Sequence, residues 1–224
     1  MIRLDCLPKT VGFTKMKKVL VTGGAGYKGC VLVPKLLEAG WRVVVYDLML
    51  FGSKGLPTHP NLQVVTGDIR DTKLFARSLL GVDRVIHMAC ISNDPSFDLD
   101  PSLSRTINYE CFEPMVKASR EAGVERFVYV SSSSVYGVSD APDVTEEHPL
   151  VPLTDYNKYK GLCEPILLRY HSPDFTTVII RPATVHEVGH GANRRRKLGL
   201  SGFLIGGKNA CDATHGVERL SNES

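Results

Sequence analysis

Short β-branched apolar runs alternate with longer amphipathic segments from Lys17 onward. The runs are mostly continuous, as in strands covered on both faces, and the longer segments repeat their apolar positions with a helical period. We expect strands at residues 19–22, 42–46, 62–66, 84–88, 127–131 and 177–180. We expect helices at residues 27–39, 72–79, 101–122 and 155–170, the first and third stopped by Gly40 and Gly123. This alternation predicts an α/β fold with a doubly wound, mostly parallel sheet.

The two ends of the chain depart from this pattern. Met16 and two lysines come directly before the first expected strand, so we interpret residues 1–15 as an N-terminal extension. Residues 186–224 hold seven glycines and a basic run from Arg194 to Lys197, a composition foreign to the expected fold. We therefore expect three parts: the extension 1–15, a domain over 16–185 and an atypical tail over 186–224.

Composition and charge exclude several classes of protein. Lys and Arg exceed Asp and Glu by 27 to 24, and the net charge of +3 gives no argument for nucleic-acid or membrane binding. The six cysteines are scattered without a C-x-x-C pair, so we expect reduced thiols and no metal site. No apolar run approaches the roughly 18 residues that span a bilayer, and residues 1–15 lack a signal-peptide pattern. We expect a cytoplasmic protein.

A glycine-rich turn lies between the first expected strand and helix, and reads Thr22-Gly23-Gly24-Ala25-Gly26-Tyr27-Lys28-Gly29. Its glycines permit a tight turn and let backbone N–H groups approach a pyrophosphate at the helix N-terminus. Asp47 ends the second strand about 20 residues later, where a carboxylate binds the adenosine ribose and repels a 2′-phosphate. A structural turn and a solvated aspartate are the alternatives, but together the features predict an NAD site. Asp68 either lies beside the adenine or caps the next turn.

Tyr156 and Lys160 are four residues apart on an expected helix, so their side chains share one face. An ammonium near a phenol favours tyrosinate and lowers the phenol's pKa toward the range of a general base. Such pairs also arise by chance on exposed helices. A run of four serines, Ser131 to Ser134, follows the fifth expected strand and places hydroxyls where open α/β sheets build their sites, which favours a catalytic pair.

These features resemble the extended short-chain dehydrogenase/reductase family, in its nucleotide-sugar epimerase and dehydratase branch, over about residues 17–185. The motifs that carry the resemblance are the T-G-x-x-G-x-x-G turn at Thr22, Asp47, Gly67-Asp68, His87-Met88-Ala89-Cys90, the serines before Val135-Tyr136-Gly137, Tyr156-x-x-x-Lys160 and Arg181-Pro182. The resemblance implies a Rossmann fold with NAD as cofactor. We expect NAD to be bound by Gly23, Gly26, Tyr27, Lys28, Gly29, Asp47, Asp68, Ile69, Ala89, Tyr156, Lys160 and Pro182.

The resemblance also implies roles for individual residues. Ser132, four residues before Tyr136, takes the position of the catalytic Ser or Thr that hydrogen-bonds the reacting sugar oxygen. Tyr156 is the catalytic base or acid, and Lys160 holds the nicotinamide ribose and tunes Tyr156. Asn108 matches a position that is usually structural.

The implied reaction begins when Tyr156 removes a hydroxyl proton as hydride passes from the sugar to NAD. Dehydratases of the family usually carry Asp and Glu directly after the catalytic hydroxyl residue, where this chain has Ser133 and Ser134. We therefore predict a nucleotide-sugar epimerase. The alternatives are a sugar dehydrogenase or reductase, a dehydratase, and a catalytically silent NAD-binding module.

The C-terminal part of the chain departs from the family. Members of this branch usually continue for a further hundred residues or more, through a smaller domain that grips the nucleotide sugar. After Arg181-Pro182 this chain instead reads toward His186-Glu187-Val188-Gly189. We expect the substrate domain to be largely absent, through a frameshift, a truncation or a divergent tail. Family members commonly pair through two helices, here those at 101–122 and 155–170, which suggests a homodimer.

Overall fold

The computed structural model describes residues 16–92, 99–140, 143–183, 186–188, 197–199 and 202–206. The extension 1–15, most of the tail and Arg194 to Arg196 of the basic run lie outside the described residues. Within the described part, no helix is both long and apolar enough to cross a membrane.

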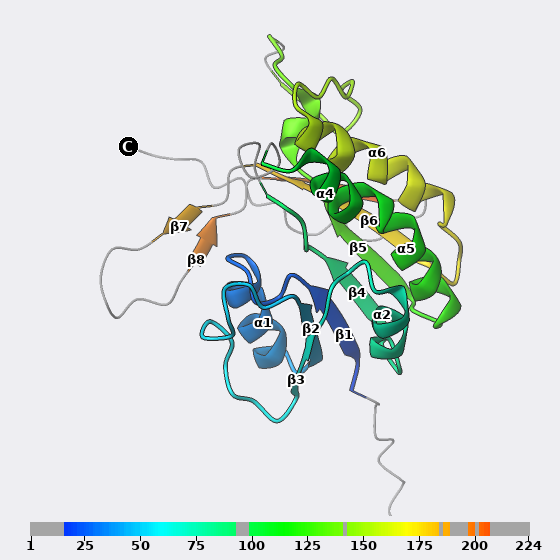
Figure 1. The fold of residues 1–224 in the computed structure, drawn as a ribbon. Coiled ribbons are helices and arrows are strands. Elements are labelled where there is room, and N and C mark those ends of the chain that lie inside the picture. The colour runs from blue at the N-terminus through cyan, green and yellow to red at the C-terminus, as the bar shows by residue number, and fades with distance from the viewer. Residues whose placement is uncertain are drawn as a thin grey trace, which may run out of the picture.

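A seven-stranded sheet with the order β3-β2-β1-β4-β5-β6-β9 forms the centre of the fold (Figure 1). Its strands are β1 (Lys18–Thr22), β2 (Arg42–Asp47), β3 (Leu62–Thr66), β4 (Arg84–His87), β5 (Arg126–Val130), β6 (Thr176–Pro182) and β9 (Gly202–Gly206). β1 to β6 pair in parallel. The order reverses direction between β1 and β4, which is where doubly wound sheets bind ligands. The predicted doubly wound, mostly parallel sheet is confirmed, with strand ends within two residues of expectation.

Three strands lie beyond residue 185, where the apolar pattern predicts none. β9 pairs antiparallel with β6 at the edge of the sheet. β7 (His186–Val188) and β8 (Lys197–Gly199) form a separate antiparallel pair. Part of the segment that we interpreted as foreign to the fold therefore extends the sheet.

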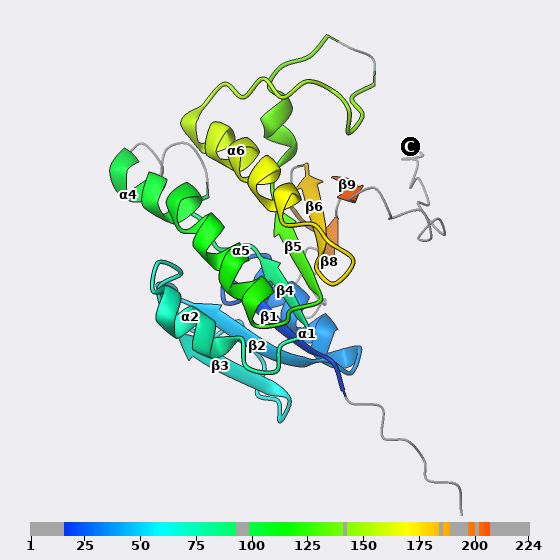
Figure 2. The same ribbon diagram turned by 90° about the vertical axis from the view of Figure 1, so that its right-hand side faces the viewer.

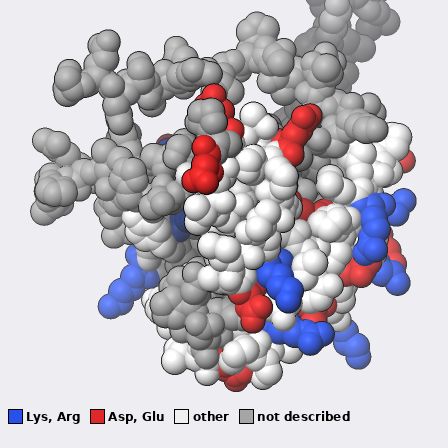
Figure 3. Space-filling model, turned by 90° about the horizontal axis from the view of Figure 1, so that it is seen from above, with Lys and Arg blue, Asp and Glu red and all other residues white. Residues whose placement is uncertain are grey.

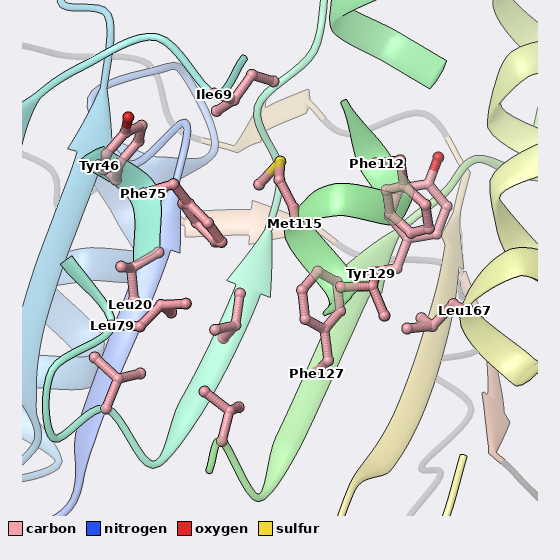
Figure 4. Packing of buried hydrophobic residues seen from close by; sticks show 14 of the residues in the cluster. Leu20, Tyr46, Ile69, Phe75, Leu79, Phe112, Met115, Phe127, Tyr129 and Leu167 are labelled. Atoms are coloured by element: carbon pink, nitrogen blue, oxygen red, sulfur yellow. The ribbon is translucent and has the colours of Figure 1, made fainter. Parts of the chain in front are cut away.

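Helices cover the two faces of the sheet unequally. α2 (Thr72–Ser78), α5 (Phe112–Glu121) and α6 (Asp155–Arg169) lie on one face, and α1 (Gly29–Glu38) lies on the other (Figure 2). The larger core packs beneath α2, α5 and α6, around the fully buried aromatic rings of Tyr46, Phe75, Phe112, Phe127 and Tyr129 (Figure 4). The smaller core packs α1 against alternate valines of β1 and β2.

The unequal cover corrects one expectation about the strands. β1 and β2 are buried on both faces, but β5 alternates between buried and half-buried residues. On β5 the buried set, which includes Phe127 and Tyr129, faces α5 and α6, whereas Val128 and Val130 point to the opposite face. Among the described helices only α1 lies on that opposite face, and it covers β1 and β2. The apolar run of β5 is therefore continuous although helices cover only one of its two faces.

The helix expected at residues 101–122 is present but is not one continuous α-helix. The structure has α4 (Pro101–Arg105), a π-helical turn η1 (Thr106–Glu110) and then α5. Asn108 lies in the π-helical turn, where its side-chain amide binds the backbone N–H of Ile91 at 2.8 Å and its carbonyl at 2.9 Å. The widened turn thus brings Asn108 against the loop after β4, and such turns are common near functional sites. The structural role expected for Asn108 agrees with these contacts.

Candidate active site

A pocket of about 550 Å³ lies at the carboxyl ends of β1, β2, β4 and β5, at the reversal in strand order. Its volume is in the range of small-molecule and cofactor sites. The lining residues come from the glycine turn, the segments after β2, β3 and β4, the end of β5 and the first turns of α6. Ten of the predicted residues line this pocket: Gly23, Gly26, Tyr27, Lys28, Asp47, Asp68, Ile69, Ala89, Tyr156 and Lys160. Gly29, Pro182 and Ser132 are not among the lining residues.

Glycine is required at two positions of the turn. Gly23 has a φ of +72°, and a Cβ on it would lie 2.8 Å from the backbone nitrogen of Ala89. Gly29 begins α1, where a Cβ would meet the carbonyl oxygen of Gly24 at 2.3 Å. The turn therefore brings the end of β1, the loop after β4 and the start of α1 into backbone contact, which no other residue type permits.

The start of α1 offers donors to an anion. Among the described residues no hydrogen-bond acceptor is found for the backbone N–H groups of Tyr27 and Lys28, and Lys28 is the N-cap without a side-chain cap. Free N–H groups and the helix dipole favour a phosphate group at this end. The residues present therefore fit the pyrophosphate of a dinucleotide.

The carboxylate of Asp47 is held in place by the backbone. Oδ2 accepts from the N–H of Ala25 at 3.0 Å, and Oδ1 accepts from the N–H of Met49 at 2.8 Å. Each carboxylate oxygen has a further lone pair for a ribose hydroxyl. Asp47 thus connects the glycine turn to the end of β2 and still has acceptor capacity toward the pocket.

Both interpretations of Asp68 are consistent with the structure. Its carboxylate accepts from the backbone N–H of Arg70 at 2.8 Å and forms an ion pair with the Arg70 guanidinium. These bonds to Arg70 lower the pKa of Asp68. Asp68 also lines the pocket, so its role in the turn is compatible with the expected place beside the adenine.

Tyr156 and Lys160 lie in the first two turns of α6. Thr154 caps this helix, its hydroxyl accepting from the N–H of Asn157 at 3.3 Å. The Lys160 ammonium donates to the carbonyl of Val130 at 2.9 Å and lies 6.0 Å from the ring centroid of Tyr156. Lys160 is only 4% exposed, so solvent screens its charge weakly. The predicted pair therefore lines one pocket with a cation beside the phenol.

Two lysines share this pocket, and their pKa values move in opposite directions. Burial disfavours the charged form of Lys160, but the negative charges that Cys90 and Tyr156 carry when ionised outweigh burial and raise the pKa of Lys160. Burial, followed by the charge of Lys160, lowers the pKa of Lys28.

Ser132 has its hydroxyl engaged inside the protein. It caps the short helix η2 (Ser133–Tyr136) and contacts the hydroxyl of Ser134 at 2.6 Å. Because Ser134 gives its own proton to Oδ1 of Asn157, the Ser132 hydroxyl is the donor in the pair of serines. Its catalytic role stays a prediction, and it requires the hydroxyl to rotate toward the pocket.

His87 is a hydrogen-bonded core residue, as its apolar surroundings favour. The Thr22 hydroxyl accepts from the N–H groups of Met88 and Ala89 and contacts Nδ1 of His87 at 2.8 Å. With both lone pairs of Thr22 used, its proton goes to Nδ1, which therefore carries none. Complete burial, and secondarily Lys160, lowers the pKa of His87 to about 3.

Several lining residues were not predicted from the sequence. Leu48, Leu50 and Phe51 follow Asp47 and line the pocket, and Phe51 is 91% exposed. Cys90 and Ser131 line it at the ends of β4 and β5. The run of four apolar residues, Leu48 to Phe51, directly after a strand-ending carboxylate could have indicated the first group. On the face seen in Figure 3, basic and acidic side chains are interspersed rather than gathered by sign.

The chain matches the NAD dependent epimerase/dehydratase family over residues 19–199, and it belongs to that family. It is 34% identical over 182 residues to a 3 beta-hydroxysteroid dehydrogenase/Delta 5-->4-isomerase of Mycobacterium tuberculosis, covering 77% of this chain and 48% of that protein. It is 33% identical over 152 residues to a UDP-glucose 4-epimerase of Lactobacillus helveticus, covering 67% and 46% respectively.

Solved structures are similar over the same region. A UDP-N-acetylglucosamine 4-epimerase from Methanobrevibacter ruminantium superposes with a TM-score of 0.68 at 27% identity, covering 74% of this chain and 54% of that one. The chain spans about half the length of the curated relatives it matches. The family is NAD-dependent, and the recognition from sequence motifs is confirmed.

Proposed function

We propose that this chain carries the cofactor-binding and catalytic half of an NAD-dependent nucleotide-sugar epimerase. The observation that carries the proposal is the position of Tyr156 and Lys160, which line the same pocket as the glycine turn and Asp47. The pocket thus combines groups suited to a dinucleotide with a phenol beside a buried cation. Enzymes of this family are among its relatives and structural neighbours.

The chain's own residues account for the proton transfer. Tyr156 removes the proton of a sugar hydroxyl, and the Lys160 ammonium stabilises the tyrosinate that this role requires. The carbonyl of Val130 holds Lys160 in place at 2.9 Å. NAD, when bound, would supply the hydride acceptor for the carbon that bears this hydroxyl. In epimerisation Tyr156 returns the proton after the hydride is delivered to the opposite face of the ketone.

Ser133 and Ser134 support epimerisation over dehydration. Elimination of water needs an acid and a base beside the reacting carbons. Both residues after Ser132 are neutral hydroxyls, and Ser134 is engaged with Asn157. No carboxylate of the described chain lines the pocket next to Tyr156; its acidic lining residues are Asp47 and Asp68.

A second candidate is a dehydrogenase that releases the ketone. The 34% identity to a hydroxysteroid dehydrogenase favours it. Tyr156 and Lys160 would also act in the oxidation of an alcohol by a dehydrogenase. The two functions differ in their net redox outcome. A dehydrogenase accumulates NADH with turnover, whereas an epimerase converts substrate without net NADH.

The test uses the full 224-residue chain with NAD, a panel of UDP- and dTDP-sugars and a 3β-hydroxysteroid. Product epimers are resolved by chromatography and NADH is followed by absorbance. We expect epimer exchange without NADH accumulation, lowered about 100-fold or more in Tyr156→Phe. Steroid oxidation with NADH accumulation supports the dehydrogenase instead. NAD binding without turnover of any substrate indicates a catalytically silent NAD-binding module.

A further inference from the structure

A second cleft, of about 610 Å³, lies at the amino ends of β4, β5 and β6, the edge of the sheet opposite the active-site pocket. We propose that it binds a small molecule bearing phosphate groups. Three arginines line it, Arg84 at the start of β4, Arg126 at the start of β5 and Arg120 at the end of α5. The proposal does not depend on the proposed enzymatic function.

The arginines of this cleft are close together and have no carboxylate partners. Arg84 and Arg126 are directly opposite each other in the register of β4 and β5. Like charges in directly opposed positions destabilise a sheet. Within the described residues no ion pair or hydrogen bond is found for the side chains of Arg84, Arg120 or Arg126, whereas Arg70, Arg105 and Arg181 all have carboxylate partners.

Arg84 carries the most specific observation. In the described part of the chain, its Nε is the sole buried side-chain nitrogen or oxygen atom that lacks a hydrogen-bond partner. Buried polar groups are almost always paired, so an exception calls for a missing partner. Arg84 also lines the cleft, and its guanidinium lies 5.0 Å from the ring centroid of Trp41.

The other charged groups do not neutralise the cleft. Glu125 and Asp174 also line it. Glu125 has its own cation, the ammonium of Lys17 at 3.5 Å, and no ion pair is found for Asp174 in the described chain. Three guanidinium groups therefore face two carboxylates, one of which is already paired.

Arginine is the residue best suited to phosphate. Its planar fork donates two parallel hydrogen bonds to a phosphate group, and three such forks match several phosphate oxygens. The cleft volume is in the range of small-molecule sites. The chemistry thus favours a phosphate ester or diphosphate over a neutral ligand.

The test is calorimetric titration of the full chain with inorganic pyrophosphate at constant ionic strength. We expect saturable binding that the double variant Arg84→Gln, Arg126→Gln weakens about tenfold or more. Arg77→Gln, an exposed arginine on α2 outside the cleft, is expected to leave affinity unchanged. Saturating NAD is present throughout, so that the active-site pocket, which also fits a pyrophosphate, is already filled. Absence of binding under these conditions, or unchanged binding in the folded double variant, would overturn the proposal.

A milder variant guards against a folding defect. Arg120 is exposed, so Arg120→Gln leaves the core intact and is expected to weaken pyrophosphate binding about threefold or more. Circular dichroism and the thermal midpoint without ligand report whether each variant is folded. Unchanged affinity in both folded arginine variants contradicts the proposal.

Discussion

The guanidinium of Arg181 forms a buried two-point ion pair with the carboxylate of Glu164. Nε lies 3.0 Å from Oε1 and a terminal nitrogen binds Oε2, and the side chains are 6% and 3% exposed. The same carboxylate accepts from the Ser131 hydroxyl at 2.7 Å, and Arg181 also donates to the hydroxyl of Tyr136 at 2.7 Å. The pair therefore connects β6 and the end of β5 to α6, where Glu164 lies one helical turn after Lys160.

Removing one charge of this pair should destabilise the fold strongly. Glu164→Gln leaves a buried guanidinium without its counter-charge, which costs ~3–5 kcal/mol. The free energy of unfolding in urea measures this loss. Glu121→Gln is the matched control, because its pair with Lys117 is exposed on both sides and is expected to contribute about 0.5 kcal/mol or less. Equal effects of the two substitutions would contradict the assigned role of Glu164.

Substitution of two glycines with positive φ distinguishes the effect of backbone strain from the loss of the cofactor site. Gly23 and Gly40 have φ values of +72° and +82°, but only Gly23 has atoms within reach of an added Cβ. We expect Gly40→Ala to lower stability by roughly 1 kcal/mol and to leave NAD affinity unchanged. Gly23→Ala should weaken NAD binding tenfold or more, since Ala89 must move. Calorimetric titration with NAD checks both, and unaltered NAD affinity in Gly23→Ala would refute the glycine-turn assignment.

Asp47 is expected to set the choice of dinucleotide. Asp47→Asn keeps one of the two oxygens that accept from the backbone and removes the charge that repels a 2′-phosphate. The ratio of NADP to NAD dissociation constants should therefore fall about tenfold or more. Asp71→Asn is the control, because Asp71 caps α2 and does not line the pocket. An unchanged ratio in Asp47→Asn would show that another group excludes NADP.

Protonation of His87 should make the fold sensitive to mild acid. His87 has a pKa of about 3 in the folded protein and about 6.5 when unfolded, so the unfolded state binds the extra proton first. The stability contribution is complete above pH 6.5 and is lost as the pH falls toward 3. Between pH 7 and 5 we expect a loss of ~2 kcal/mol from this residue. The free energy of unfolding in urea, measured for wild type and His87→Gln at pH 7 and at pH 5, checks this. The variant is expected to lose less stability than wild type between the two pH values, and equal losses would contradict the role of His87.

Local pattern was sufficient to predict the six parallel strands of the sheet and most of the pocket, but not β9. Strand order follows from parallel β-α-β connections, so the carboxyl ends of β1, β2, β4 and β5 had to meet at one edge. Spacing alone placed Tyr156 and Lys160 on one face of a helix, and the observed pocket is lined by both.

Contacts between distant segments could not be predicted in this way. The π-helical turn at Asn108 depends on the backbone of Ile91, which lies in another segment. The bonds of Ser132 depend on Asn157, which comes from α6, so a motif could place Ser132 near the site but not orient its hydroxyl. Whether both faces of a strand are buried likewise depends on which helices pack against each face of the sheet.

The role of Ser132 provides the last test of the catalytic set. Its hydroxyl donates to Ser134 in the structure, so it must rotate before it can bind a reacting oxygen. If it does so, Ser132→Ala should lower kcat about tenfold or more while NAD affinity stays constant, because Ser132 does not line the pocket. Ser132→Thr should restore most of the rate, since it keeps the hydroxyl. Ser133→Ala, the neighbouring position without a hydrogen bond from its side chain among the described residues, should be close to wild type. Equal rates for Ser132→Ala and Ser133→Ala would mean that Ser132 only caps η2, and that Tyr156 and Lys160 act without it.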